Sequence, residues 1–112
     1  MSFDRHDLSR LRWTLGGWVP YTWRLRRSTG VETVFVPEFG PVPARVPGSV
    51  QAALLKAGII SDWTIGLNCY GSEWIERRHW EFSTVLPSEW FPLSQPVWLR
   101  CEGLDYRGTV LV

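Results

Sequence analysis

Two aromatic and two polar residues stand close together in the middle of the chain. They are Asn68, Tyr70, Trp74 and Glu76, which lie within nine residues. A pyranose ring presents a face of C–H groups that packs on an aromatic side chain, while flanking polar groups bind its hydroxyls. The four residues are therefore candidate sugar-binding residues. Trp74 fits the hydrophobic core as well, because tryptophan buries a large apolar surface.

Asn68 also has a structural interpretation. Gly66 and Gly71 lie on either side of it in the sequence. Asparagine and glycine are typical turn residues, because asparagine bonds to nearby backbone and glycine accepts a positive φ. Asn68 is thus either a sugar ligand or a turn residue, and the sequence leaves both readings open.

Carboxylates are the second group of residues with possible chemistry. Hydrolysis of a glycosidic bond needs two of them across the scissile bond, about 5 to 5.5 Å apart in enzymes that retain configuration. The local candidates are Glu73, Glu76 and Glu81. Arg77 and Arg78 follow Glu76, so an exposed ion pair explains this residue more simply. We expect no catalytic residue in this chain.

The histidines and cysteines give no pattern of metal ligands. His6 and His79 are far apart in the sequence, and Cys69 and Cys101 lack the paired spacing of a zinc site. We expect neither a metal nor another cofactor. Free cysteine usually packs inside a protein, so the two thiols are expected to be reduced and buried.

Composition limits the partners of the chain. Its 112 residues fit one domain, spanning residues 1–112, and the 45% of hydrophobic residues is enough to form a core. A net charge of +1 provides no field for nucleic acid or anionic lipid, although an excess of arginine in residues 1–30 keeps single-stranded nucleic acid as a minor alternative. No apolar run approaches the roughly 20 residues of a membrane span, and the charged start is unlike a signal peptide. We therefore expect a cytoplasmic protein without membrane or nucleic-acid partners.

One short helix is predicted in the segment PGSVQAALLKAG. Ser49 is a typical N-cap, and Gly58 is a typical residue for the C-terminal stop. The apolar residues Val50, Ala53, Leu54 and Ala57 fall on one face of the helix.

The other predicted elements are short strands with turn residues between them. They cover residues 12–15, 21–26, 31–36, 79–86, 97–102 and 106–112, and the Gly16–Gly17 pair is expected to separate the first two. This pattern predicts an all-β sandwich or jelly roll. The chain stops in the apolar run Thr109–Val112, which would leave an exposed edge, so we expect it to be a fragment of a longer protein.

Three segments carry a resemblance to a known family. They are LGGW (15–18) followed by ARVPGSVQAALLKAGIISDW (44–63), then IGLNCYGSEWIERRHWEFSTVL (65–86), then WLRCEGLDYRGTVLV (98–112). In this order they resemble the N-terminal sugar-binding domain of glycoside hydrolase family 2, in its β-mannosidase and exo-β-glucosaminidase branch. The chain departs from the family pattern at Asp62-Trp63, where Asp-Pro is usual.

The resemblance implies a partial galactose-binding-like jelly roll with one short helix. It implies an accessory domain of a retaining exo-β-glycosidase, which cleaves terminal β-linked sugars and carries its catalytic glutamates on a later barrel domain. This domain would pack on that barrel and could face the rim of its pocket with the loop around Asn68 and Tyr70. The alternative is a stand-alone carbohydrate-binding module that uses exposed tryptophans.

Overall fold

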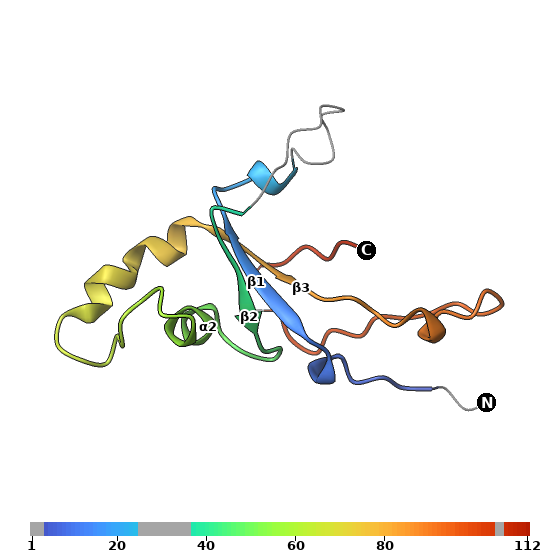
Figure 1. Cartoon of the computed structure of the whole chain (residues 1–112). Coiled ribbons are helices and arrows are strands. Elements are labelled where there is room, and N and C mark those ends of the chain that lie inside the picture. The colour runs from blue at the N-terminus through green and yellow to red at the C-terminus, as the bar shows by residue number, and fades with distance from the viewer. Residues whose placement is uncertain (1–3, 25–36, 105–106) are drawn as a thin grey trace.

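A three-stranded antiparallel sheet in the order β2-β1-β3 forms the centre of the molecule (Figure 1). The computed structural model describes residues 4–24, 37–104 and 107–112. The strands are β1 (Trp13–Trp18), β2 (Phe39–Ala44) and β3 (His79–Ser83). The helices among these described residues are α2 (Val50–Lys56) and the 3₁₀ helices η1 (Leu8–Arg10), η2 (Thr22–Arg24), η3 (Asn68–Arg77) and η4 (Ser88–Trp90).

Two glycines lie inside the central strand, where the sequence predicts a break. Gly17 pairs with Trp80 of β3, and the indole ring of Trp80 lies so close that a Cβ atom on Gly17 would be 2.6 Å from it. In the same way, a Cβ atom on Gly16 would be 2.9 Å from Cγ of Pro37. Glycine interrupts a strand by propensity, but here its missing side chain makes room for neighbours. The strand therefore runs on to Trp18.

β2 was not predicted, and its prolines explain why. Pro41 and Pro43 lie within this strand, and proline is found in sheets only where no N–H is needed. Pro43 is paired with Thr14 of β1, and β2 is an edge strand, in which every second N–H points away from the sheet and needs no strand partner. The prolines therefore lie on the outer edge of β2, which they protect from pairing with another strand. The strand predicted at 31–36 lies outside the described residues.

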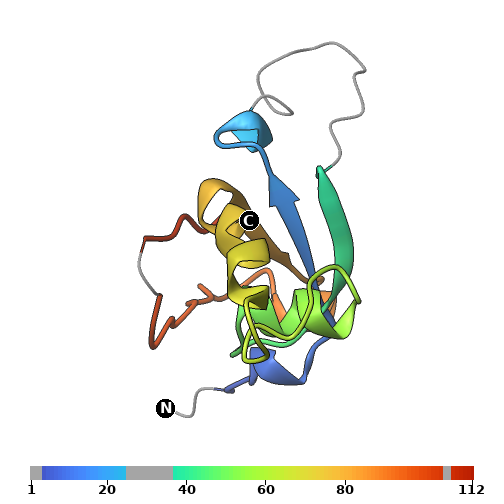
Figure 2. The ribbon, with the colours of Figure 1, turned by 90° about the vertical axis from the view of Figure 1, so that its left-hand side faces the viewer.

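The core lies between the sheet and two helices that pack on one side of it (Figures 1 and 2). Leu54, Ile60 and Ile75 form a buried cluster. Half-buried side chains that pack against this cluster are Val50, Leu55, Trp74 and Trp80. Leu15 of β1 is buried, at 1% exposure, and pairs with Phe82.

Helix α2 confirms the predicted helix and its end signals. Ser49 accepts a hydrogen bond from the Ala52 amide at 3.1 Å, as an N-cap does. At the other end Gly58 has a φ of +76°, and the amides of Gly58 and Ile59 donate to Leu55 and Leu54. This pair of bonds is the Schellman motif, which glycine favours because it lacks a Cβ. Ala53 and Leu54 are buried as expected, whereas Ala57 is exposed.

Several strand predictions are wrong within the described residues. Residues 22–24 form η2 instead of a strand, and residues 97–102 and 107–112 have no regular structure and are exposed. A strand needs a neighbour to satisfy its backbone groups, and none pairs with these segments in the part of the chain that the structure describes. Cys69 and Cys101 are exposed, so the expected burial of the thiols is also wrong.

In the described part of the chain, the architecture is a small antiparallel sheet with two helices of more than one turn, α2 and η3, where the sequence predicted one. It agrees with a partial all-β fold. The chain after β3 extends away on the side of the sheet opposite to α2 (Figure 1). Within the described ranges, no helix is both long and apolar enough to cross a membrane.

Candidate functional site

All four predicted sugar-binding residues lie on η3. Asn68 is the first residue of this helix, and its Nδ2 donates to the backbone oxygen of Asp62 at 3.0 Å. The backbone N–H of Asn68 also donates to the Ile65 carbonyl at 3.2 Å. The side chain therefore ties the loop 62–68 to the start of η3, which agrees with the turn interpretation, while the residue itself stays exposed.

A second local bond holds the same loop. The Asp62 carboxylate accepts from the Thr64 amide at 2.9 Å and from the Thr64 hydroxyl at 2.7 Å. These two hydrogen bonds, the hydroxyl first, lower the pKa of the Asp62 carboxyl, because they stabilise its charged form. The loop before η3 is thus held by polar contacts at both of its ends.

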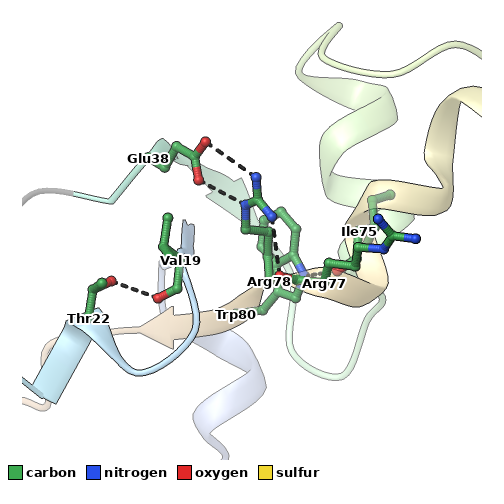
Figure 3. Close-up of polar contacts among 7 residues, drawn as sticks. All are labelled: Val19, Thr22, Glu38, Ile75, Arg77, Arg78 and Trp80. Atoms are coloured by element: carbon green, nitrogen blue, oxygen red, sulfur yellow. Dashed lines mark hydrogen bonds and ion pairs between the residues drawn. The ribbon is translucent and has the colours of Figure 1, made fainter.

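Trp74 packs toward the interior. Its ring centroid lies 4.5 Å from that of Phe39 and 5.9 Å from that of Trp80. Trp80 is fixed in turn, because its Nε1 donates to the Ile75 carbonyl at 2.9 Å (Figure 3). This arrangement agrees with the core interpretation of Trp74, which joins η3 to β2 and β3.

The ion pair at the end of η3 involves a different carboxylate from the expected one. Arg78 binds Glu38 through Nε at 2.8 Å and Nη2 at 3.4 Å, and its Nη1 donates to the Arg77 carbonyl (Figure 3). Glu76 has no such partner among the described residues and is exposed. The sequence suggested a Glu76 pair because the arginines are adjacent to it, but Glu38 of the chain before β2 is brought to Arg78 by the fold.

Tyr70 is the exposed aromatic residue of η3, with 65% of its surface accessible. Ile65 and Leu67, in the preceding loop, are also exposed, at 62% and 76%. In a 3₁₀ helix, residues three apart share a side, so Glu76 follows Tyr70 two turns later, about 12 Å along the axis. We define the loop surface as Ile65, Leu67, Asn68 and Tyr70; Trp74 turns away from it and Glu76 lies further along η3.

No cluster of three or more histidine, cysteine, aspartate or glutamate side chains occurs within the described ranges. An open hollow near the N-terminus is lined by Arg5, His6, Asp7, Arg10, Leu11 and Trp90. There the imidazole of His6 stacks on Trp90 with ring centroids 4.1 Å apart. None of the four predicted sugar-binding residues lines this hollow. The sequence did not indicate it, because Trp90 is far from the other lining residues along the chain.

Within the described ranges, an exposed apolar loop stands beside a small antiparallel sheet. A comparison with protein families places the chain among the glycosyl hydrolase 2 galactose-binding domain-like proteins: the family model matches residues 23–112. The chain belongs to this family. The resemblance found in the sequence is thereby confirmed.

The curated relatives are fungal β-mannosidases. Beta-mannosidase A of Emericella nidulans is 35% identical over 69 residues, which cover 62% of this chain and 7% of that protein. Beta-mannosidase A of Aspergillus terreus is 29% identical over 105 residues, or 94% of this chain and 9% of that protein. Beta-mannosidase B of Aspergillus clavatus is 31% identical over 70 residues, which cover 62% of this chain and 8% of that protein.

The aligned part of this chain therefore spans less than a tenth of the length of these relatives. No solved structure matches the chain.

Proposed function

We propose that the chain is the N-terminal accessory domain of a β-mannosidase-like glycoside hydrolase, which removes terminal β-linked sugars. The observation that carries this proposal is the family match over residues 23–112, together with relatives that are named β-mannosidases. The catalytic glutamates are expected on another domain of the parent protein, and the role of this domain is to support and border that site.

The complete domain is proposed to be a galactose-binding-like jelly roll. Two features support this. The side chains of β3 from His79 to Phe82 are half-buried on both faces of the strand, as in a sheet that is covered on both sides. Residues 97–104 and 107–112 include many exposed apolar residues, such as Val97, Trp98 and Leu99, which suits strands of a second layer.

The loop surface is proposed to pack at the rim of the catalytic domain. Isolated exposed apolar residues are ordinary, but Ile65, Leu67 and Tyr70 lie within six residues and are all more than 60% exposed. The hydrogen bonds of Asp62 and Asn68 hold this loop in place. At that rim Tyr70 and Asn68 would contact the sugar, with Glu76 about 12 Å further along η3. Trp74 would hold η3 on the core, since it packs on Phe39 and Trp80.

The alternative is a stand-alone carbohydrate-binding module. Its platform would consist of exposed tryptophans, of which Trp98 at 84% and Trp63 at 37% are the examples. The other six of the eight tryptophans are buried or half-buried. The accessory-domain function is therefore the better supported of the two.

The test is the hydrolysis of p-nitrophenyl β-mannoside by the full-length protein. We expect activity on this substrate, with an increase in KM of about fivefold to tenfold in Tyr70→Ala, because one aromatic contact is worth roughly 1 kcal/mol. Tyr70→Phe keeps the ring and is expected to behave like the wild type. A protein inactive on β-mannosides and on other β-glycosides would exclude the enzyme function, and tryptophan fluorescence titrations with oligosaccharides would then test the binding module.

A further inference from the structure

An aromatic side chain occupies a turn position that normally belongs to glycine. The chain leaves β1 through Val19-Pro20-Tyr21-Thr22, in which the Thr22 amide donates to the Val19 carbonyl at 3.1 Å. Tyr21 has a φ of 68°, so this is a type II turn with proline second and tyrosine third. The Thr22 hydroxyl adds a bond to the same carbonyl at 2.7 Å (Figure 3). A tyrosine here strains the backbone, and a reason for it should be sought in its side chain.

His79 organises this turn from the neighbouring strand. Its Nδ1 accepts from the Tyr21 amide at 3.2 Å and from the Trp23 Nε1 at 3.0 Å. An acceptor nitrogen carries no proton, so the ring proton lies on Nε2. No described residue accepts from this second nitrogen, which leaves a hydrogen-bond donor directed away from the turn. Tyr21 meets the imidazole edge-on, with centroids 4.7 Å apart.

Arg24 completes the group with a positive charge. Its Cζ lies 5.0 Å from the Tyr21 ring centroid and 5.1 Å from that of Trp23, so both rings hold the guanidinium by cation–π contact. Within the described ranges no carboxylate lies within ion-pair distance of Arg24. Glu81, two residues along β3, already has an interaction partner. Among the described residues, nothing occupies the donors of this guanidinium, which can therefore bind a ligand.

We define the turn cluster as Tyr21, Trp23, Arg24 and His79. Two of its polar groups can only donate, the guanidinium and the imidazole Nε2–H, and the tyrosine hydroxyl beside them both donates and accepts. A neutral sugar is bound best by a mixture of donors and acceptors, whereas a site of donors favours an anion. The Tyr21 side chain, in a residue that is 56% exposed, offers an apolar plate beside these donors. A carboxylate attached to a pyranose ring satisfies both features.

We infer that the turn cluster binds an acidic sugar, a uronic acid residue, at a site separate from the loop surface. The carboxylate is held by the guanidinium of Arg24, a ring hydroxyl accepts from His79 Nε2–H, and the C–H face lies on Tyr21. His79 and Trp23 act as positioning residues, because they hold Tyr21 in its strained conformation. The choice of a sugar among carboxylates rests on the proposed function, whereas the choice of an anion rests on the cluster itself.

The test compares methyl β-D-glucuronide with methyl β-D-glucoside, which differ by a carboxylate in place of a hydroxymethyl group. Both are titrated into the full-length protein, and binding is followed by the NMR signal of the Trp23 indole N–H, assigned with Trp23→Phe. We expect the glucuronide to shift this signal and to bind at least about tenfold more tightly than the glucoside, as one charge-assisted pair allows. Sodium acetate is titrated as the free carboxylate.

Three variants separate the contributions. Arg24→Met is expected to abolish the preference for the glucuronide. Tyr21→Gly suits the φ of the turn, so it keeps the fold while it weakens the binding of both sugars. Arg45→Met is the matched control. It removes an arginine charge next to Ala44, which pairs with Trp13 at the opposite end of β1, so this variant is expected to bind both sugars like the wild type.

Each contrary result overturns the inference. Equal binding of the two glycosides, an unchanged preference in Arg24→Met or an equal loss in Arg45→Met would exclude a carboxylate site at the turn cluster. Acetate as effective as the glucuronide would exclude a sugar site. Hydrolysis of β-mannoside is measured in parallel: if it persists while the glucuronide fails to bind, this inference fails and the proposed function stands.

Discussion

At the scale of residues, the Asp62 carboxylate shows how the loop surface is held. Thr64 donates to it twice, and these bonds hold the pKa of the Asp62 carboxyl below its usual value. A carboxyl whose pKa is lower in the folded state contributes stability above its unfolded pKa, and this contribution is lost as the pH falls through the folded pKa. The loop is therefore expected to loosen only under acidic conditions.

Thr64→Val tests this contact. The substitution removes the hydroxyl, which is the largest cause of the shift, and keeps the backbone donor. We expect the pKa of Asp62 to rise toward its usual value, as measured by NMR titration of the side-chain carboxyl carbon. Asp7 serves as the internal control, because its pKa is lowered by Ser9 instead and should not move. An unchanged Asp62 titration would show that the hydroxyl does not bind the carboxylate in solution.

At the scale of elements, the sheet and η3 meet through Trp80. Its ring lies over Gly17 of β1, contacts Trp74 of η3 and is fixed by the Ile75 carbonyl. An added methyl group at Gly17 would come within 2.6 Å of this ring. Because Trp80 is held on its other sides, it has little freedom to yield.

Gly17→Ala should therefore destabilise the domain by about 1–3 kcal/mol, the usual cost of overpacking. Thermal unfolding followed by circular dichroism would measure it. Gly71→Ala is the matched control, since a Cβ atom there meets nothing within 4 Å and η3 tolerates alanine. If both variants unfold at the temperature of the wild type, Trp80 does not press on β1 as described.

The same elements show what a sequence can predict. Helix α2 was predicted because its signals are local: Ser49 bonds three residues ahead, and Gly58 takes the conformation that ends the helix. β2 was not predicted because Pro41 and Pro43 disfavour a strand, unless the strand is known to lie at the edge of a sheet. The turn cluster escaped because Tyr21 and His79 are 58 residues apart, and only the pairing of β1 with β3 brings them together.

For the candidate site, the sequence predicted a segment and left the roles of its residues open. Asn68, Tyr70, Trp74 and Glu76 do share one helix. Their spacing cannot say which of them turns inward, because that depends on the packing of Phe39 and Trp80 around Trp74. The ion pair of Arg78 could not be predicted for the same reason, because its partner Glu38 lies in a distant part of the sequence.

At the scale of the whole molecule, the chain is elongated. Its radius of gyration is 16.8 Å, with extents of 55, 37 and 22 Å, whereas a compact chain of this length would have a radius of about 13 Å. Residues after β3 leave the sheet and contribute to this length (Figure 1). Residues 91–104 are all exposed, and Leu93 and Trp98 have 108% and 84% of their reference surface accessible.

This distribution of burial predicts two levels of protection in hydrogen exchange on the 112-residue chain. Amides of β1 and α2 should exchange slowly, because they are bonded and lie around Leu15 and Leu54. Amides of residues 97–102 should exchange at nearly the rate of an unfolded chain, since no strand pairs with them in the described part. Strong protection of residues 97–102 would contradict the observed conformation and would show instead that this segment pairs as the strand that its sequence predicts. The same measurement on the full-length protein should show that protection, if the segment completes the proposed jelly roll there.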